Sequence, residues 1–75
     1  MQLQTAKDFG KLIRTVRLQQ HLKQVELATA SGTGERFIVD LEKGKPTCEL
    51  GKALHVARML GIKIEAAGLL GISDA

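Results

Sequence analysis

The segment 31–34, Ser-Gly-Thr-Gly, restricts the fold more than any other part of this sequence. It lies between two short segments whose apolar residues have helical spacing, and its two glycines can adopt positive φ without a steric cost. The chain has 75 residues and one cysteine, so no intrachain disulfide can hold these segments together. We therefore expect two short helices joined by a tight turn and packed within one compact domain.

Apolar periodicity predicts three helices around this turn, over about 6–20, 24–30 and 35–43. Thr5 can cap the first helix, and Gly10 within it would permit a second helix to approach closely. The first helix should bury one face, made of Phe9, Leu12, Ile13 and Val16. The two short helices should bury a further set, namely Val25, Leu27, Ala28, Ile38 and Leu41, with Phe37 at the edge.

The segment 43–47 predicts the end of one helix and the start of the next. Gly44 suits the position just past a helix end, Pro46 prevents the helix from continuing, and Thr47 can cap a fourth helix. That helix should end at Gly61 and bury the apolar residues Leu50, Leu54, Ala57 and Leu60.

Residues 62–66, Ile-Lys-Ile-Glu-Ala, alternate between apolar and polar with the period of a strand. A single strand leaves its backbone groups unpaired, and no other segment of the sequence has this pattern. We therefore expect Ile62, Ile64 and Ala66 to form a dimerisation strand that pairs with a second copy of the chain. The predicted fold is all-α, with a domain over 1–66. The tail, 67–75, could dock on a partner, pack on the fourth helix or be disordered.

Charge and composition exclude several classes of function. The net charge is +3, and the basic residues gather in two groups, which suits phosphate contacts but also suits ordinary solvated helix faces. The two histidines and the cysteine lack metal-ligand spacing, and the sequence contains no phosphate-binding loop or nucleophile–base set. We expect no metal, no cofactor and no enzyme activity. The sequence also lacks an apolar membrane span and a signal peptide, which predicts a cytoplasmic protein.

Two short helices joined by a glycine-containing turn are typical of a helix-turn-helix motif. In such a motif the first helix braces against the DNA backbone, while the polar outer face of the second helix reaches base edges in the major groove. The same packing also occurs in small helical bundles that bind proteins, so the pattern leaves both functions open.

Residues 22–28 (LKQVELA), 31–34 (SGTG) and 37–47 (FIVDLEKGKPT) resemble the Cro/phage-repressor-like, XRE-type helix-turn-helix family. The resemblance covers roughly residues 6–66. Within the family, the ending LEKGKPT with a following helix and an alternating strand is similar to HipB-type antitoxins, whose partner toxins are HipA-like serine/threonine kinases. The resemblance implies a lambda-repressor-like domain of four to five helices whose terminal strand pairs across a homodimer, associated with the bacterial nucleoid.

The resemblance also implies roles for individual residues. The positions that match the family's DNA-facing residues are Gln24, Thr33, Glu35, Arg36, Val39, Asp40, Lys43 and Lys45, and Lys23 could add a phosphate contact at the start of the second helix. Among them, Gln24 would brace the motif on a phosphate, and Arg36 is the best candidate for reading a guanine through two hydrogen bonds. Arg17 and Glu42 occupy the positions of an interhelical ion pair.

Four residues depart from the family pattern. Lys23 and Gly34 stand where the two short helices usually begin after a capping Thr or Ser. Glu35 and Asp40 place carboxylates on a surface that would face phosphates. Such carboxylates could accept from cytosine N4 or orient Arg36 through a salt bridge.

Three hypotheses about function follow. The first is a repressor that binds a palindromic operator in double-stranded DNA, regulates its own operon and neutralises a HipA-like kinase toxin. The second is a phage-type or metabolic repressor without a toxin. The third is a helix-turn-helix module that binds proteins and not DNA.

Overall fold

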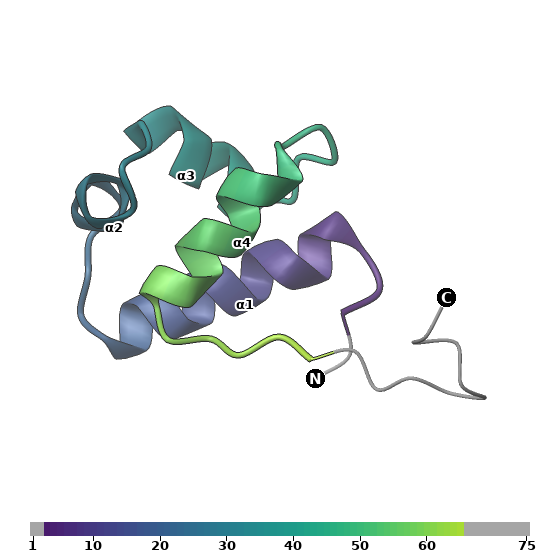
Figure 1. Cartoon of the computed structure of the whole chain (residues 1–75), viewed down its shortest axis with the longest axis horizontal. Coiled ribbons are helices and arrows are strands. Elements are labelled where there is room, and N and C mark those ends of the chain that lie inside the picture. The colour runs from purple at the N-terminus through teal and green to yellow at the C-terminus, as the bar shows by residue number, and fades with distance from the viewer. Residues whose placement is uncertain (1–2, 66–75) are drawn as a thin grey trace.

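The computed structural model describes residues 3–65 (Figure 1). These residues form four helices, α1 (Ala6–Gln19), α2 (Gln24–Ser31), α3 (Glu35–Lys43) and α4 (Leu50–Met59), and no strand. Ala66, which was predicted to end the dimerisation strand, and the tail 67–75 lie outside the described residues. No helix within 3–65 has the length and apolar character needed to cross a membrane.

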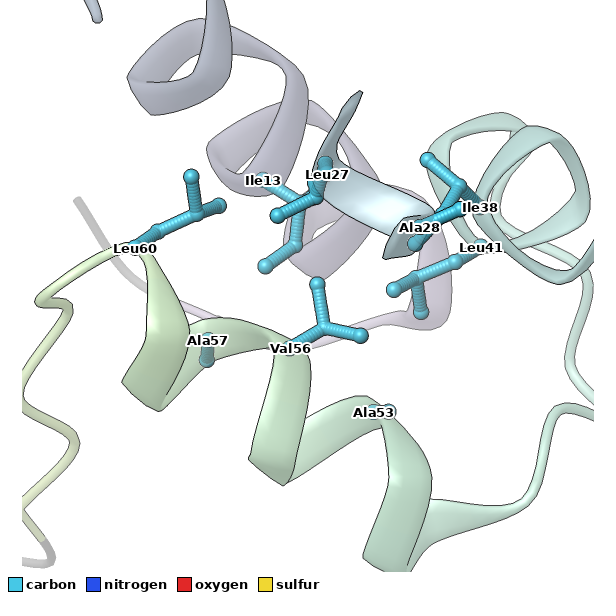
Figure 2. Close-up of a cluster of buried hydrophobic side chains, with 9 residues drawn as sticks. All are labelled: Ile13, Leu27, Ala28, Ile38, Leu41, Ala53, Val56, Ala57 and Leu60. Carbon is cyan, nitrogen blue, oxygen red and sulfur yellow. The ribbon is translucent and has the colours of Figure 1, made fainter. Parts of the chain in front are cut away.

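All four helices contribute to one aliphatic core. Figure 2 shows their side chains pointing into a single cluster, which consists of Ile13, Leu27, Ala28, Ile38, Leu41, Ala53, Val56, Ala57 and Leu60. Helix α3 packs against both α1 and α2, and α2 also packs against α4. The expected burial of Ile13, Leu27, Ala28, Ile38 and Leu41 is confirmed.

The first helix begins where the sequence predicted. The Thr5 hydroxyl accepts from the Asp8 N–H at 3.1 Å, and the Asp8 carboxylate accepts from the N–H groups of Gln4 and Thr5 at 3.0 and 3.2 Å. These hydrogen bonds, led by the one from Gln4, lower the pKa of Asp8 because they stabilise its charged form. The capping box therefore satisfies backbone donors that the first turn leaves free.

Helices α1 and α3 approach each other backbone to backbone at Gly10. A Cβ atom added at Gly10 would lie 2.4 Å from the carbonyl oxygen of Leu41 and 2.8 Å from that of Glu42. Glycine is required here because any side chain would occupy the space that the α3 backbone fills. The expected close approach is confirmed.

The prediction for the start and the buried face of α4 was partly wrong. Thr47 lies in the turn before the helix, and Glu49 is the N-cap, with its carboxylate accepting from the Lys52 N–H at 2.9 Å. Leu50 is 69% exposed and Leu54 is 37% exposed. The buried face is instead formed by Ala53, Val56, Ala57 and Leu60. The two alanines let the α4 backbone approach the core, which places the larger Leu54 at the surface.

Val25 also differs from its predicted place, since it is 47% exposed. It lies in the first turn of α2, while Leu27 and Ala28 carry the contact with the core. A helix of eight residues buries only a narrow stripe, and Val25 lies beside that stripe.

Residues 62–65 follow α4 without regular secondary structure. The Ile62 N–H donates to the Ala57 carbonyl at 2.9 Å, and the Ile62 side chain packs against the core of its own chain. Ile64 is 44% exposed. Since the expected strand needs a second chain as its partner, its formation stays a prediction.

Candidate nucleic-acid interface

A tight left-handed turn connects α2 to α3. Gly32 has a φ of 69°, and the following Thr33 N–H donates to the Ala28 carbonyl at 2.9 Å, which closes the end of α2. A positive φ favours glycine because it lacks a Cβ atom. The turn thus sets the angle between the two helices, and the third helix begins at Glu35 directly after Gly34.

The inner side of α3 is fixed by a buried carboxylate, Glu42. Arg17 of α1 donates to it through Nε at 2.6 Å and through Nη2 at 3.0 Å, and the two side chains are only 6% and 3% exposed. The Arg17 Nη1 atom also donates to the Leu22 carbonyl at 2.7 Å. The two bonds to Glu42 connect α1 with α3, and the bond to Leu22 connects α1 with the loop that precedes α2. The structure thus brings Arg17 and Glu42 into the pair that the resemblance implied.

Gln24 joins the same network from the start of α2. Its Nε2 atom donates to Glu42 Oε1 at 3.1 Å. Arg14, whose side chain is 59% exposed, approaches the same oxygen at 3.9 Å from the solvent side. Sequence reasoning missed both contacts with Glu42, because only the folded chain brings these three positions together. We refer to Arg17, Gln24 and Glu42 as the brace.

The outer side of α3 carries a mixture of charges. Glu35 and Arg36 are exposed, with the Arg36 side chain 82% exposed, whereas Val39 is partly buried. Lys43 at the end of the helix is exposed, and the Lys45 side chain just beyond it is 54% exposed. The residues predicted to face bases and phosphates on α3 and just beyond its end are therefore at least partly exposed.

Asp40, on the same side of α3, is partly buried like Val39, and its side chain is only 18% exposed. Its Oδ1 atom lies 3.4 Å from Arg36 Nε, one helical turn earlier, and its Oδ2 atom lies 3.6 Å from Lys45 Nζ. Of the two carboxylates that the sequence offered as partners for Arg36, Glu35 and Asp40, it is Asp40 that forms this i,i+4 pair. The contact with Lys45 was missed, because it depends on how the chain turns at Gly44.

Lys23 and Thr33 flank the two short helices. Lys23 is exposed, and its backbone N–H donates to the Glu26 carboxylate at 2.7 Å, but its side chain makes no cap. Thr33 is partly buried, with its hydroxyl 3.4 Å from the Ser31 hydroxyl. Gly34 likewise provides no side-chain cap for α3. Both departures from the family pattern therefore leave helix starts without the usual side-chain acceptor.

Helix α3 ends in a second left-handed turn. Gly44 has a φ of 83°, and the Lys45 N–H donates to the Asp40 carbonyl at 3.0 Å. A Cβ atom at Gly44 would lie 2.7 Å from Lys7 Cα, so the turn packs directly on the start of α1. The backbone thereby fixes where Lys43 and Lys45 stand relative to the helix.

Comparison with known proteins identifies relatives among regulators. No protein-family model matches the chain. The chain is 52% identical over 63 residues to the uncharacterized HTH-type transcriptional regulator y4mF of Sinorhizobium fredii, covering 84% of this chain and 83% of that protein. It is 41% identical over 39 residues to the ImmF control region 10 kDa protein of Bacillus phage phi105, covering 52% of this chain and 43% of that protein. Together with the α2–turn–α3 geometry, these relatives show that the chain belongs to the XRE/Cro-like helix-turn-helix family of transcriptional regulators.

Proposed function

We propose that the chain binds double-stranded DNA by inserting α3 into the major groove. One observation carries this proposal: the inner side of α3 is held by the buried brace, while its outer side presents an arginine that is 82% exposed. A rigid helix with a polar outer face is what direct reading of base edges needs. Membership of a family of transcriptional regulators supports the same function.

Five residues of α2, α3 and the loop after α3 have chemistry that suits a contact with DNA. Arg36 would donate to guanine, and Val39 would contact a thymine methyl group. Lys43 and Lys45 would bind phosphates, since both extend from the end of α3. Gln24 can keep its bond to Glu42 and still bind a phosphate, because its amide nitrogen carries two hydrogens.

Thr33 and Lys23 would add contacts to the DNA backbone on the other side of the motif. The Thr33 hydroxyl can donate to a phosphate oxygen, and the exposed Lys23 ammonium offers a charge at the start of α2. The N-terminus of α2 carries a partial positive charge that favours the same phosphate. These contacts would fix the register of the motif without reading sequence.

The test is the binding of purified chain to a pool of randomised DNA duplexes, sequenced after selection, at two salt concentrations. We expect enrichment of an inverted repeat and a steep loss of affinity with salt, because cations on the protein displace counterions from DNA. Lack of any enriched sequence would favour the protein-binding module instead.

A second copy of the chain would complete the operator contact, because a two-fold dimer reads two half-sites one helical turn apart. The surface proposed for this contact is a hollow of about 190 Å³ lined by Leu54, Arg58, Ile62 and Ile64. It includes two apolar residues that a monomer leaves exposed, Leu54 and Ile64. It also continues into the segment proposed to pair as a strand.

The mass of the chain in solution tests the dimer. We expect Ile64→Asp to shift the protein towards the monomer, because it places a charge in the apolar contact. Val25→Asp is the control, since Val25 has a similar exposed fraction, 47% against 44%, but lies on α2 outside this surface. A dimer unchanged by Ile64→Asp would contradict the proposed surface.

The finer proposal is that the chain represses its own operon and acts as a HipB-like antitoxin. It rests on the resemblance of residues 41–47, together with the helix and the alternating segment 61–66 that follow them, to HipB-type proteins. A HipA-like kinase encoded beside this chain should bind it and lose activity when both are mixed. If no such kinase accompanies the gene, a phage-type repressor is the favoured function, which the similarity to the phage phi105 control-region protein supports.

A further inference from the structure

Asp40 differs from Glu35, the other acidic residue on the outer side of α3, in the charges that surround it. Both oxygens of Asp40 face a cation, Arg36 Nε at 3.4 Å and Lys45 Nζ at 3.6 Å. Glu35, on the same helix, is exposed and makes no ion pair within the described residues. Asp40 is also 18% exposed, while Arg36 is 82% exposed, so the carboxylate lies nearer the body of the protein than its partner.

The atom of Arg36 that Asp40 contacts matters for recognition. A guanidinium reads guanine through two parallel N–H donors, which bind O6 and N7. A carboxylate placed at Nε occupies one edge of the group and leaves the Nη1–Nη2 edge for the base. The contact also restricts the long Arg36 side chain before DNA binds. Arg36 therefore loses less rotamer freedom on binding than an unrestricted arginine would lose.

We infer that Asp40 is a positioning residue for sequence discrimination: it holds Arg36 by Nε so that the outer edge of the guanidinium reads a base, and it contacts no base itself. This inference rests on the proposed binding of DNA by α3. Lys45, paired to the second oxygen, keeps Asp40 in place from the loop after α3. Asp40 therefore lowers affinity for DNA in general, because it offsets part of the charge of two cations, and it raises the preference for one base pair.

The experiment compares Asp40→Asn with Glu35→Gln, which removes the same charge from the same helix without breaking an ion pair. Both variants should keep the fold, since the Asp40 carbonyl still accepts from the Lys45 N–H and Glu35 is exposed. Binding is measured on the duplex selected by the wild-type chain, on duplexes with the Arg36 base pair replaced, and on a scrambled duplex. Arg36→Ala identifies that base pair beforehand.

We expect both variants to bind the scrambled duplex more tightly than wild type. Only Asp40→Asn should reduce the preference for the Arg36 base pair, by about 2- to 5-fold, the range for an exposed ion pair. In the Arg36→Ala background, Asp40→Asn should change base preference no further, because it acts through Arg36. Asp40→Glu should restore part of the preference, since a glutamate at i,i+4 can still reach the arginine.

Three results would overturn the inference. The first is an unchanged base preference in Asp40→Asn, and the second is an equal loss of preference in Glu35→Gln. The third is a further loss from Asp40→Asn in the Arg36→Ala background, which would make Asp40 a direct reader of a base. Failure of the wild-type chain to select any duplex would instead count against the proposed function, so the two failures are distinguishable.

Discussion

Gly10→Ala should destabilise this protein, although alanine is the better helix former. The replaced residue is buried in the middle of α1, where a Cβ atom would lie 2.4 Å from the Leu41 carbonyl oxygen and 2.8 Å from that of Glu42. Ordinary contacts between a Cβ atom and a neighbouring heavy atom begin at 3.4 Å. The two helices must therefore move apart by a large fraction of an ångström, and both obstacles are backbone atoms that cannot rotate away.

Two opposing contributions set the magnitude. The gain in helix propensity from glycine to alanine is about 1 kcal/mol. Forcing an extra methyl group into a packed interior costs about 1–3 kcal/mol, and a rigid backbone places this site at or above the upper end. Displacement of α3 would also strain the bond from Arg17 to Glu42. We expect a net loss of about 2 kcal/mol, which corresponds to a fall in Tm of roughly 8–16 °C for a domain of this size.

Thermal and urea denaturation followed by circular dichroism measure this loss. The control is Gly51→Ala in α4, where the added Cβ atom would meet only Glu49 Oε2, at 3.6 Å. That variant should be neutral or more stable, by at most about 1 kcal/mol, because only the propensity changes. A Tm for Gly10→Ala equal to or above that of the wild type would refute the close approach of α1 and α3.

The other predictions concern charge and burial. Glu42→Ala should lower the free energy of unfolding by about 3–5 kcal/mol, because it leaves Arg17 buried without its partner; a loss below 1 kcal/mol in urea denaturation would contradict the brace. Asp8→Asn should destabilise the protein at neutral pH. The difference in the free energy of unfolding between the variant and the wild type should disappear as the pH falls through the lowered pKa of Asp8, because the wild type then loses its carboxylate charge too. Denaturation at several pH values checks this. Val56→Ala should lower the free energy of unfolding by about 1–3 kcal/mol, and Leu50→Lys should lower it by less than about 0.5 kcal/mol. Equal losses in the two variants would support the buried face that the sequence predicted for α4.

The element order and much of the core followed from local patterns. Thr5 with Asp8, Gly32 and Gly44 mark helix ends through chemistry that depends on a few neighbouring residues, so their effect is visible in the sequence. The bounds of α3, Glu35–Lys43, follow from such signals. Similarly, an apolar residue at i, i+3 and i+4 reports a buried face wherever the helix has enough neighbours, as for Ile13, Ile38 and Leu41.

Apolar spacing did not predict the buried face of α4 correctly, because packing decided which of two apolar faces of this helix contacts the core. Leu50 and Leu54 have helical spacing, but Ala53 and Ala57 form the contact because their small size lets α4 approach the core. Periodicity records which residues are apolar and not how closely two backbones approach, so it favoured the larger side chains. Hydrophobicity alone could not resolve this choice.

Turns, caps and apolar spacing act over a few residues, so the amino-acid sequence was sufficient to predict a helix-turn-helix protein. How α3 is held, and which charges surround its outer side, became visible only in the folded chain. Glu42 receives Arg17 from 25 positions away and Gln24 from 18, and Asp40 is enclosed by Arg36 and by Lys45 beyond a left-handed turn. Such contacts depend on how the helices cross in space. Because the crossing results from the packing of the whole core, no single segment of the sequence predicts it.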